Sequence, residues 1–179
     1  MFGKIGALAL LAALFCQPVS AEEFGRVAFN FDAEENEWFT VINQDSERTI
    51  ASAEITTFGP LSTLAINAYR EPRFSAREIL NIEVMYSRGF SGNVEPDYSR
   101  PAGVGITLFT EGMSGPVWDG RNVQIDIEAY DLSGDIGQIT ATFSAELCRA
   151  EELYADPDES TCRPISGTVE TQVRIPAQD

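Results

Sequence analysis

The residues of this chain that could do chemistry are few in kind, because it contains no histidine and its single lysine is Lys4. Beyond that lysine, the chain cannot assemble Ser-His-Asp, Cys-His, Ser-Lys or lysine Schiff-base catalysis from its own side chains. A histidine-ligated zinc or copper site is excluded for the same reason. We therefore expect no catalytic residue of these kinds and interpret the chain as a protein that is not an enzyme.

Cys148 and Cys162 are the only cysteines beyond residue 21. A thiolate nucleophile or a metal-bound cysteine is usually assisted by histidine, which this chain lacks. An even number of cysteines in an exported chain is instead typical of disulfides. We predict that Cys148 and Cys162 form a structural bridge.

The remaining reactive groups are carboxylates, with 28 Asp and Glu in the chain. A glycosidase needs two of them on either side of the scissile bond. Asp126 with Glu128, or Asp119 with Asp126, could form such a pair, and this activity stays open as an alternative. Because Asp126 and Glu128 alternate with apolar residues, we expect them to be solvated charges on the outer face of a strand.

Calcium is the cation that an oxygen-only ligand set suits best. Residues 131–135 and 156–159 are short acidic turns, but neither has the ligand spacing of an EF-hand. We expect no cofactor, with Ca²⁺ as the open alternative.

Two glycine-rich stretches, residues 87–102 and 110–121, interrupt the strand pattern. Loops carry binding function on rigid scaffolds, and aromatic and arginine side chains dominate binding hot spots. The predicted binding residues on these stretches are Arg88, Phe90, Tyr98, Arg100, Met113 and Trp118. For Tyr98 and Trp118, packing in the core is the competing interpretation.

The first 21 residues have the layout of a secretory signal peptide. Lys4 precedes an apolar run over residues 5–15, and small residues end at Ala21. The run is shorter than the roughly 20 residues that span a bilayer. We predict cleavage after Ala21, no permanent membrane anchor, and a periplasmic or secreted protein. Cys16 follows Phe15 where lipoprotein processing requires a small residue, so we assign it to the discarded segment.

The charge after residue 21 is strongly negative. Removing Lys4 from the 12 basic residues leaves 11 arginines against 28 acidic residues, a formal charge of −17. Such a charge repels nucleic acids and anionic lipids. We expect no nucleic-acid partner; the charge serves solubility in a saline medium or favours a basic protein.

Short alternating runs dominate the remainder of the chain. Residues 122–130 place Val123, Ile125, Ile127 and Ala129 on one face, and residues 139–148 place five apolar residues at every second position. Eight or nine such runs, separated by turn signals, predict one antiparallel β-sandwich over residues 22–179, with a closed β-barrel as the alternative. Ser75 and Glu78 also fit a capping box, which predicts one helical turn over residues 75–80.

The last two runs, residues 139–148 and 162–175, predict a terminal hairpin. Cys148 and Cys162 lie where its strands meet the acidic connecting loop. The predicted disulfide therefore closes the hairpin.

A loop in which Ser91 and Gly92 precede Tyr98, within an acidic exported β-protein with one disulfide, resembles the periplasmic lysozyme inhibitors. That family uses an SGxxY loop against a basic enzyme. Here the tyrosine is six residues after Gly92 instead of three, so no site residue is carried over from the family. The resemblance implies an inhibitor of a basic hydrolase as an alternative function. The interpretation that the residues favour is a non-catalytic binding or structural module of a bacterial periplasm or cell surface.

Overall fold

The computed structural model describes residues 21–44, 48–58, 61–86 and 102–176, and all of its regular elements are β-strands. They are β1 (Glu22–Phe31), β2 (Glu34–Gln44), β3 (Thr49–Ala51), β4 (Ala53–Phe58), β5 (Leu61–Tyr69), β6 (Ile79–Tyr86), β7 (Gly103–Phe109), β8 (Val117–Asp131), β9 (Ile136–Ala150) and β10 (Asp158–Arg174). The all-β prediction is confirmed. The described residues form ten strands where eight or nine were expected, because the run from residue 49 to 58 divides at Ser52 into β3 and β4.

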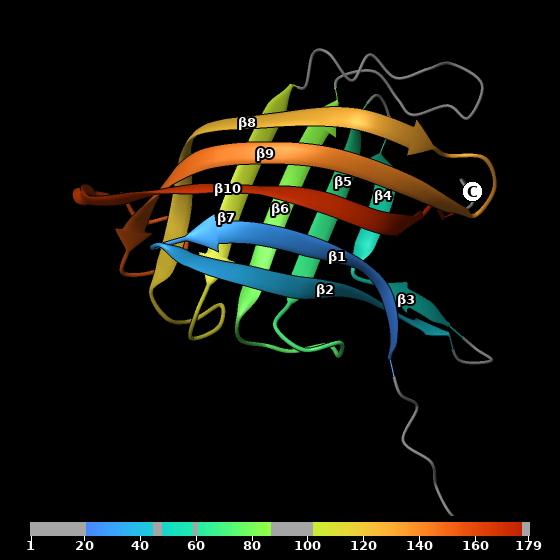
Figure 1. Cartoon of the computed structure of the whole chain (residues 1–179), viewed down its shortest axis with the longest axis horizontal. Helices are drawn as coiled ribbons and strands as arrows, with labels where there is room; N and C mark the ends of the chain where they lie inside the picture. The colour runs from blue at the N-terminus through green and yellow to red at the C-terminus, as the bar shows by residue number, and fades with distance from the viewer. Residues whose placement is uncertain (1–20, 45–47, 59–60, 87–101, 177–179) are drawn as a thin grey trace, which may run out of the picture.

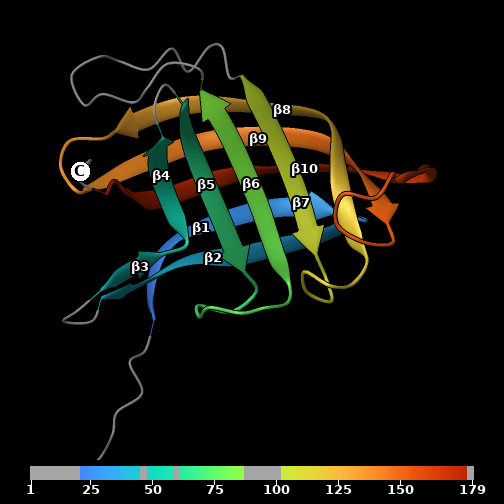
Figure 2. The same cartoon turned by 180° about the vertical axis from the view of Figure 1, so that it is seen from behind.

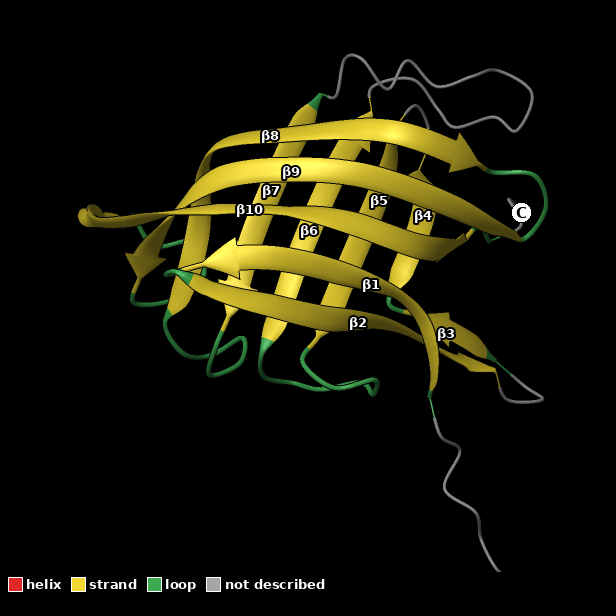
Figure 3. Ribbon diagram, in the orientation of Figure 1, coloured by secondary structure: helices red, strands yellow, loops and turns green. Residues whose placement is uncertain are grey.

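The strands lie in two layers that cross obliquely (Figure 1). One layer holds β8, β9, β10, β1 and β2, and the other holds β4 to β7 (Figure 2). We call these the front and back layers. Neighbours pair antiparallel, apart from a single parallel pair between Arg174 of β10 and Glu54 of β4. Figure 3 shows that the described part of the chain consists of these strands and short connections.

Strand β8 passes from the back layer to the front. Its first residues, Val117 to Asp119, pair with the end of β7, while the strand pairs with β9 along its length. Gly120 makes this corner possible, because a Cβ there would lie 2.7 Å from the carbonyl oxygen of Ile106. Asn122 has a φ of 51°, and the register with β9 shifts between Arg121 and Gln124. The strand bends at this bulge.

The core fills the space between the layers. The five alternating apolar residues of β9 are all buried, as the sequence predicts: Ile139, Ala141, Phe143, Ala145 and Leu147. Val123, Ile125 and Ile127 of β8 are only half-buried. Ala129 is exposed, contrary to the predicted alternation, because a second register shift between Ile127 and Ala129 turns the following residues out of phase.

Polar groups join the layers at one seam. The Ser52 hydroxyl accepts a hydrogen bond from the Val41 amide of β2 at 2.8 Å, and the Ser52 carbonyl accepts one from the Asn67 amide of β5 at 2.7 Å. Within the front layer, the buried hydroxyls of Thr40 on β2 and Thr171 on β10 are 2.6 Å apart and hydrogen-bond across β1. Gly25 of β1 pairs with both threonines, and a Cβ there would lie 2.4 Å from the Thr171 Cα. The contact therefore requires glycine at this position.

The helical turn expected over residues 75–80 is wrong. Ser75 does use its hydroxyl locally, accepting from the Arg77 amide at 3.1 Å, but the bond closes a turn two residues long. The segment is an irregular connection from β5 to β6. Serine side chains stabilise such turns as readily as they cap helices.

Substitution of Gly167 tests how closely β10 approaches its neighbours β1 and β9. It lies in β10 opposite Phe29 and Phe143, and a Cβ would lie 2.3 Å from the Ala28 carbonyl oxygen and 2.8 Å from the Phe143 ring. We expect Gly167→Ala to lower the free energy of unfolding by about 1–3 kcal/mol or more, because β1 and β10 must move apart. Urea denaturation measures this change.

Gly105→Ala is the matched control, since Gly105 also lies in a strand but has nothing within 4 Å of its Cβ position. It should leave stability unchanged or slightly raised. Equal effects of the two substitutions would contradict the close approach at Gly167.

Candidate functional site

Four of the predicted binding residues, Arg88, Phe90, Tyr98 and Arg100, lie outside the described residues. Met113 lies in the connection from β7 to β8 with 65% of its surface exposed. The segment that carries the other four precedes β7 in the sequence, whereas the connection that carries Met113 follows β7. A binding role for these residues stays a prediction.

Trp118 is half-buried and packs against its neighbours. Its ring meets Phe31 edge-to-face, with centroids 5.3 Å apart. The Arg163 guanidinium lies over the Trp118 ring, 5.6 Å from its centroid, and also pairs with the Asp32 carboxylate. Both contacts favour this position of the guanidinium, although the Arg163 side chain is 46% exposed. Trp118 thus supports Arg163, a residue that the sequence analysis did not select.

Arg163 and Asp32 stand at one end of a hollow on the outer surface of the front layer. The hollow has a volume of about 580 Å³ and crosses four strands, β1, β10, β9 and β8. At a strand separation of about 4.8 Å, it is about 14 Å long. No aromatic side chain of the described residues lines it.

Two rows of residues border the hollow. One row is uncharged and in register across the four strands: Asn30, Ser166, Ser144 and Gln124. The other row is charged or paired: Asp32, Arg163, Glu146 and Asn122. The Asn122 side-chain amide donates to Glu146 at 2.8 Å. Short hydroxyl side chains in the middle, flanked by longer groups, leave the surface hollow.

Carboxylates stand on the outer strands at both sides of this uncharged centre. Asp126 and Glu128 are exposed on β8, and Glu35 and Glu37 are exposed on β2. The row between them is again uncharged, since Asp126 aligns with Thr142, Thr168 and Ala28 on successive strands. We call this surface, from β8 to β2, the outer face. It offers hydrogen bonds in the middle and carboxylates at its borders, of which Glu37 is paired with Arg26 at 3.2 Å.

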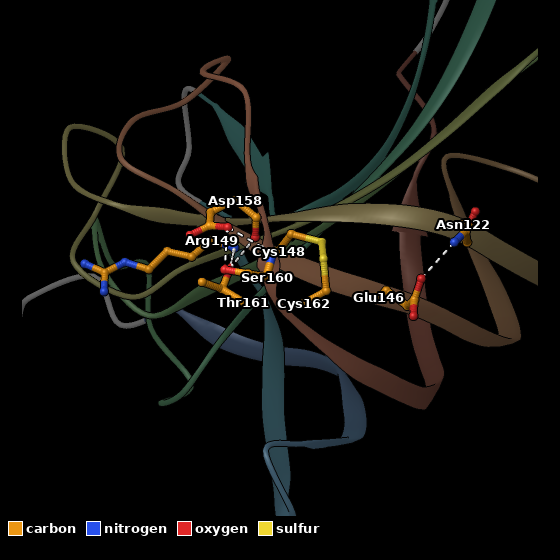
Figure 4. Close-up of a disulfide and its surroundings, with 8 residues drawn as sticks. All are labelled: Asn122, Glu146, Cys148, Arg149, Asp158, Ser160, Thr161 and Cys162. Carbon is orange, nitrogen blue, oxygen red and sulfur yellow. Dashed lines mark hydrogen bonds between the residues drawn. A yellow bond between two sulfur atoms is a disulfide. The ribbon is translucent and has the colours of Figure 1, made fainter.

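The predicted disulfide is present between Cys148 and Cys162 (Figure 4). The bridge holds an irregular part of β10 as well as the end of the hairpin. Residues 159–162 of β10 all lie opposite Cys148, because Asp158 aligns with Arg149 and Arg163 aligns with Leu147. Cys148 is fully buried. The bridge thus fastens an irregular four-residue bulge to the core, directly before Arg163.

Hydrogen bonds within the bulge involve Asp158. Its carboxylate accepts from the amide of Ser160 at 2.9 Å and from its hydroxyl at 2.6 Å. These bonds lower the pKa of Asp158 below its ordinary value, with the hydroxyl bond as the larger cause. The Thr161 hydroxyl accepts from the Arg149 amide of β9 at 2.8 Å. The bulge is therefore ordered by polar contacts as well as by the disulfide.

The proposed carboxylate pairs do not line an enclosed site. Asp126 and Glu128 are exposed on the open outer surface of β8, as expected for solvated charges, and Asp119 is half-buried. In the part of the chain that the structure describes, no group of three or more Asp, Glu, Cys or His residues gathers as a metal site.

Comparison of the chain with protein-family models, with curated proteins and with solved structures gives no significant match. Among the described residues, no helix has the length and apolar character to cross a membrane. The disulfide favours a non-cytoplasmic compartment, where cysteines are kept oxidised.

Replacing both Cys148 and Cys162 by serine should lower the free energy of unfolding by about 3 kcal/mol, the value for a loop of about 15 residues in the chain-entropy account. Chemical denaturation of the variant and of the reduced native chain measures the loss. If both denaturation curves coincide with that of the oxidised protein, the bridge contributes nothing to stability.

Ser160→Ala should raise the pKa of Asp158 toward its ordinary value of 3.8, because it removes the hydroxyl bond. A carboxyl pKa that is lower in the folded than in the unfolded chain stabilises the fold at pH values above the ordinary pKa. This contribution is lost as the pH falls through the folded-state pKa. Carboxyl NMR titration of the native chain and of the variant measures the pKa of Asp158 in each. Asp131, whose pKa Ser133 lowers in the same way, is the internal control and should not move. An Asp158 titration that the substitution leaves unchanged would contradict the assignment.

Proposed function

We propose that this chain is an exported, non-catalytic binding module of a bacterial periplasm or cell surface, and that its partner is a basic protein. The observation that carries the proposal is the outer face of the front layer. The uncharged rows at its centre would hydrogen-bond a partner, and the carboxylates at its borders would attract a cationic one.

The charge balance supports the same partner. Among the described residues, at least five arginines form ion pairs with acidic neighbours: Arg26, Arg70, Arg73, Arg163 and Arg174. With 28 acidic residues in the chain, most carboxylates have no arginine available to pair with them. A surplus of one sign increases the rate of encounter with partners of the opposite sign.

Export is supported by the signal-like first 21 residues and by the disulfide. For the architecture we propose a β-sandwich. Its two layers are joined by few residue pairs: one between β2 and β5, one between β10 and β4, and three between β7 and β8. A closed barrel is held together by full-length ladders on every side.

Binding to a basic lysozyme and to a basic protein of unrelated fold tests the partner class. Affinity should fall steeply between ionic strengths of about 0.01 M and 1 M, where the Debye length shrinks from about 30 Å to 3 Å. Lysozyme acetylated on its lysines is the control and should bind weakly. Salt-insensitive binding, or no binding to either basic protein, would contradict the proposal. Inhibition confined to lysozyme would select the narrower function of a hydrolase inhibitor.

A further inference from the structure

We propose that an extended basic segment of the partner adds to the front layer as a further strand along β8, at residues 124–127. The inference rests on the proposed function, since it locates the basic partner on the molecule. Addition of a strand to an open sheet edge is a recurring mode of peptide recognition.

The edge of β8 is open over this stretch in the part of the chain that the structure describes. Residues 124–131 pair with β9 on one side, whereas β7 pairs with β8 only at Val117 to Asp119. The strand forms the upper border of the front layer in Figure 1. Its outward amides and carbonyls are therefore available to a ladder partner.

The described residues cover the inner side chains of β8 only partly on the same side. Val123, Ile125 and Ile127 pack against the core but are half-buried, while Phe143 and Ala141, their neighbours on β9, are 4% and 1% exposed. Val104 on the facing β7 is also half-buried. An added strand with apolar residues at every second position would bury this row.

The outer side chains of β8 define the charge of the partner. Gln124, Asp126 and Glu128 are exposed there, so cross-strand neighbours with positive charge stabilise the pair and negative ones oppose it. This argues against a second copy paired edge to edge, because the Asp126 and Glu128 carboxylates of the two copies would repel each other. The occupant has alternating apolar and basic residues.

The two bulges of β8 limit the length of the added strand. The register with β9 shifts between Arg121 and Gln124 and again between Ile127 and Ala129, so the regular stretch that begins at Gln124 ends after four residues. So short a ladder gives modest affinity and depends on the charges beside it. It also distinguishes this stretch from an edge that any strand could extend.

The experiment uses synthetic ten-residue peptides and the full mature chain. The first peptide alternates valine with arginine, the second has the same composition in two blocks, and the third is the first with N-methyl groups on alternate amides. Anisotropy titration gives the affinities. The alternating peptide should bind about tenfold or more tightly than the other two, because only it supplies both the ladder and the apolar row.

Two charge-reversal variants with equal net charge test the location. Asp126→Lys with Glu128→Lys should weaken binding of the alternating peptide about tenfold or more. The control, Glu151→Lys with Glu152→Lys, reverses two exposed charges in the loop from β9 to β10 and should change affinity about twofold or less. Hydrogen exchange should show new protection within residues 124–127 when the peptide is bound.

Equal losses in the two variants would overturn the location while leaving the basic-partner proposal intact. Protection of the outward amides of residues 124–127 in the free protein would overturn it as well, because the chain itself would then cover the edge. Failure of both basic proteins to bind in a salt-dependent way is the separate result that would overturn the proposed function.

Discussion

The fold depends on one pairing, in which β10 lies between β1 and β9. These strands come from the two ends of the described chain, and seven residue pairs join β10 to β1. The approach is close enough that Gly25 and Gly167 must lack side chains. Without this pairing the front layer would separate into a β1–β2 hairpin and a β8–β9–β10 unit. The outer face would be lost with it, because the hollow takes residues from both parts.

The polar seam and the disulfide act on this same layer. Thr40 and Thr171 bond across β1, and so connect β2 directly to β10. Ser52 joins β2 to the back layer. Buried hydroxyls need such partners, since an unpaired one costs about 1–3 kcal/mol. The disulfide fixes the bulge that precedes Arg163, and Arg163 in turn lies over Trp118 beside Asp32. The hollow is therefore positioned by groups on both sides of β10.

Local signals in the sequence predicted a good part of this structure. Strict alternation placed the core residues of β9, and the absence of histidine assigned Cys148 and Cys162 to a bridge. The pairing of β1 with β10 could not be predicted in this way, because alternation specifies which face is buried and carries no information about the neighbouring strand. The bulges of β8 were missed for a similar reason, and Ala129 became exposed as a result. The candidate site was harder still. Asn30, Ser144, Ser166 and Gln124 are ordinary polar residues in sequence, and only their common register makes them a surface.

Native-state hydrogen exchange tests the central role of β10 most directly. If β10 holds the front layer together, its amides within residues 165–171 and those of β1 within residues 25–31 should exchange only through global unfolding. They should then rank with the slowest in the chain. Exchange of these amides through a local opening at low denaturant, while β5 and β6 stay protected, would contradict the account.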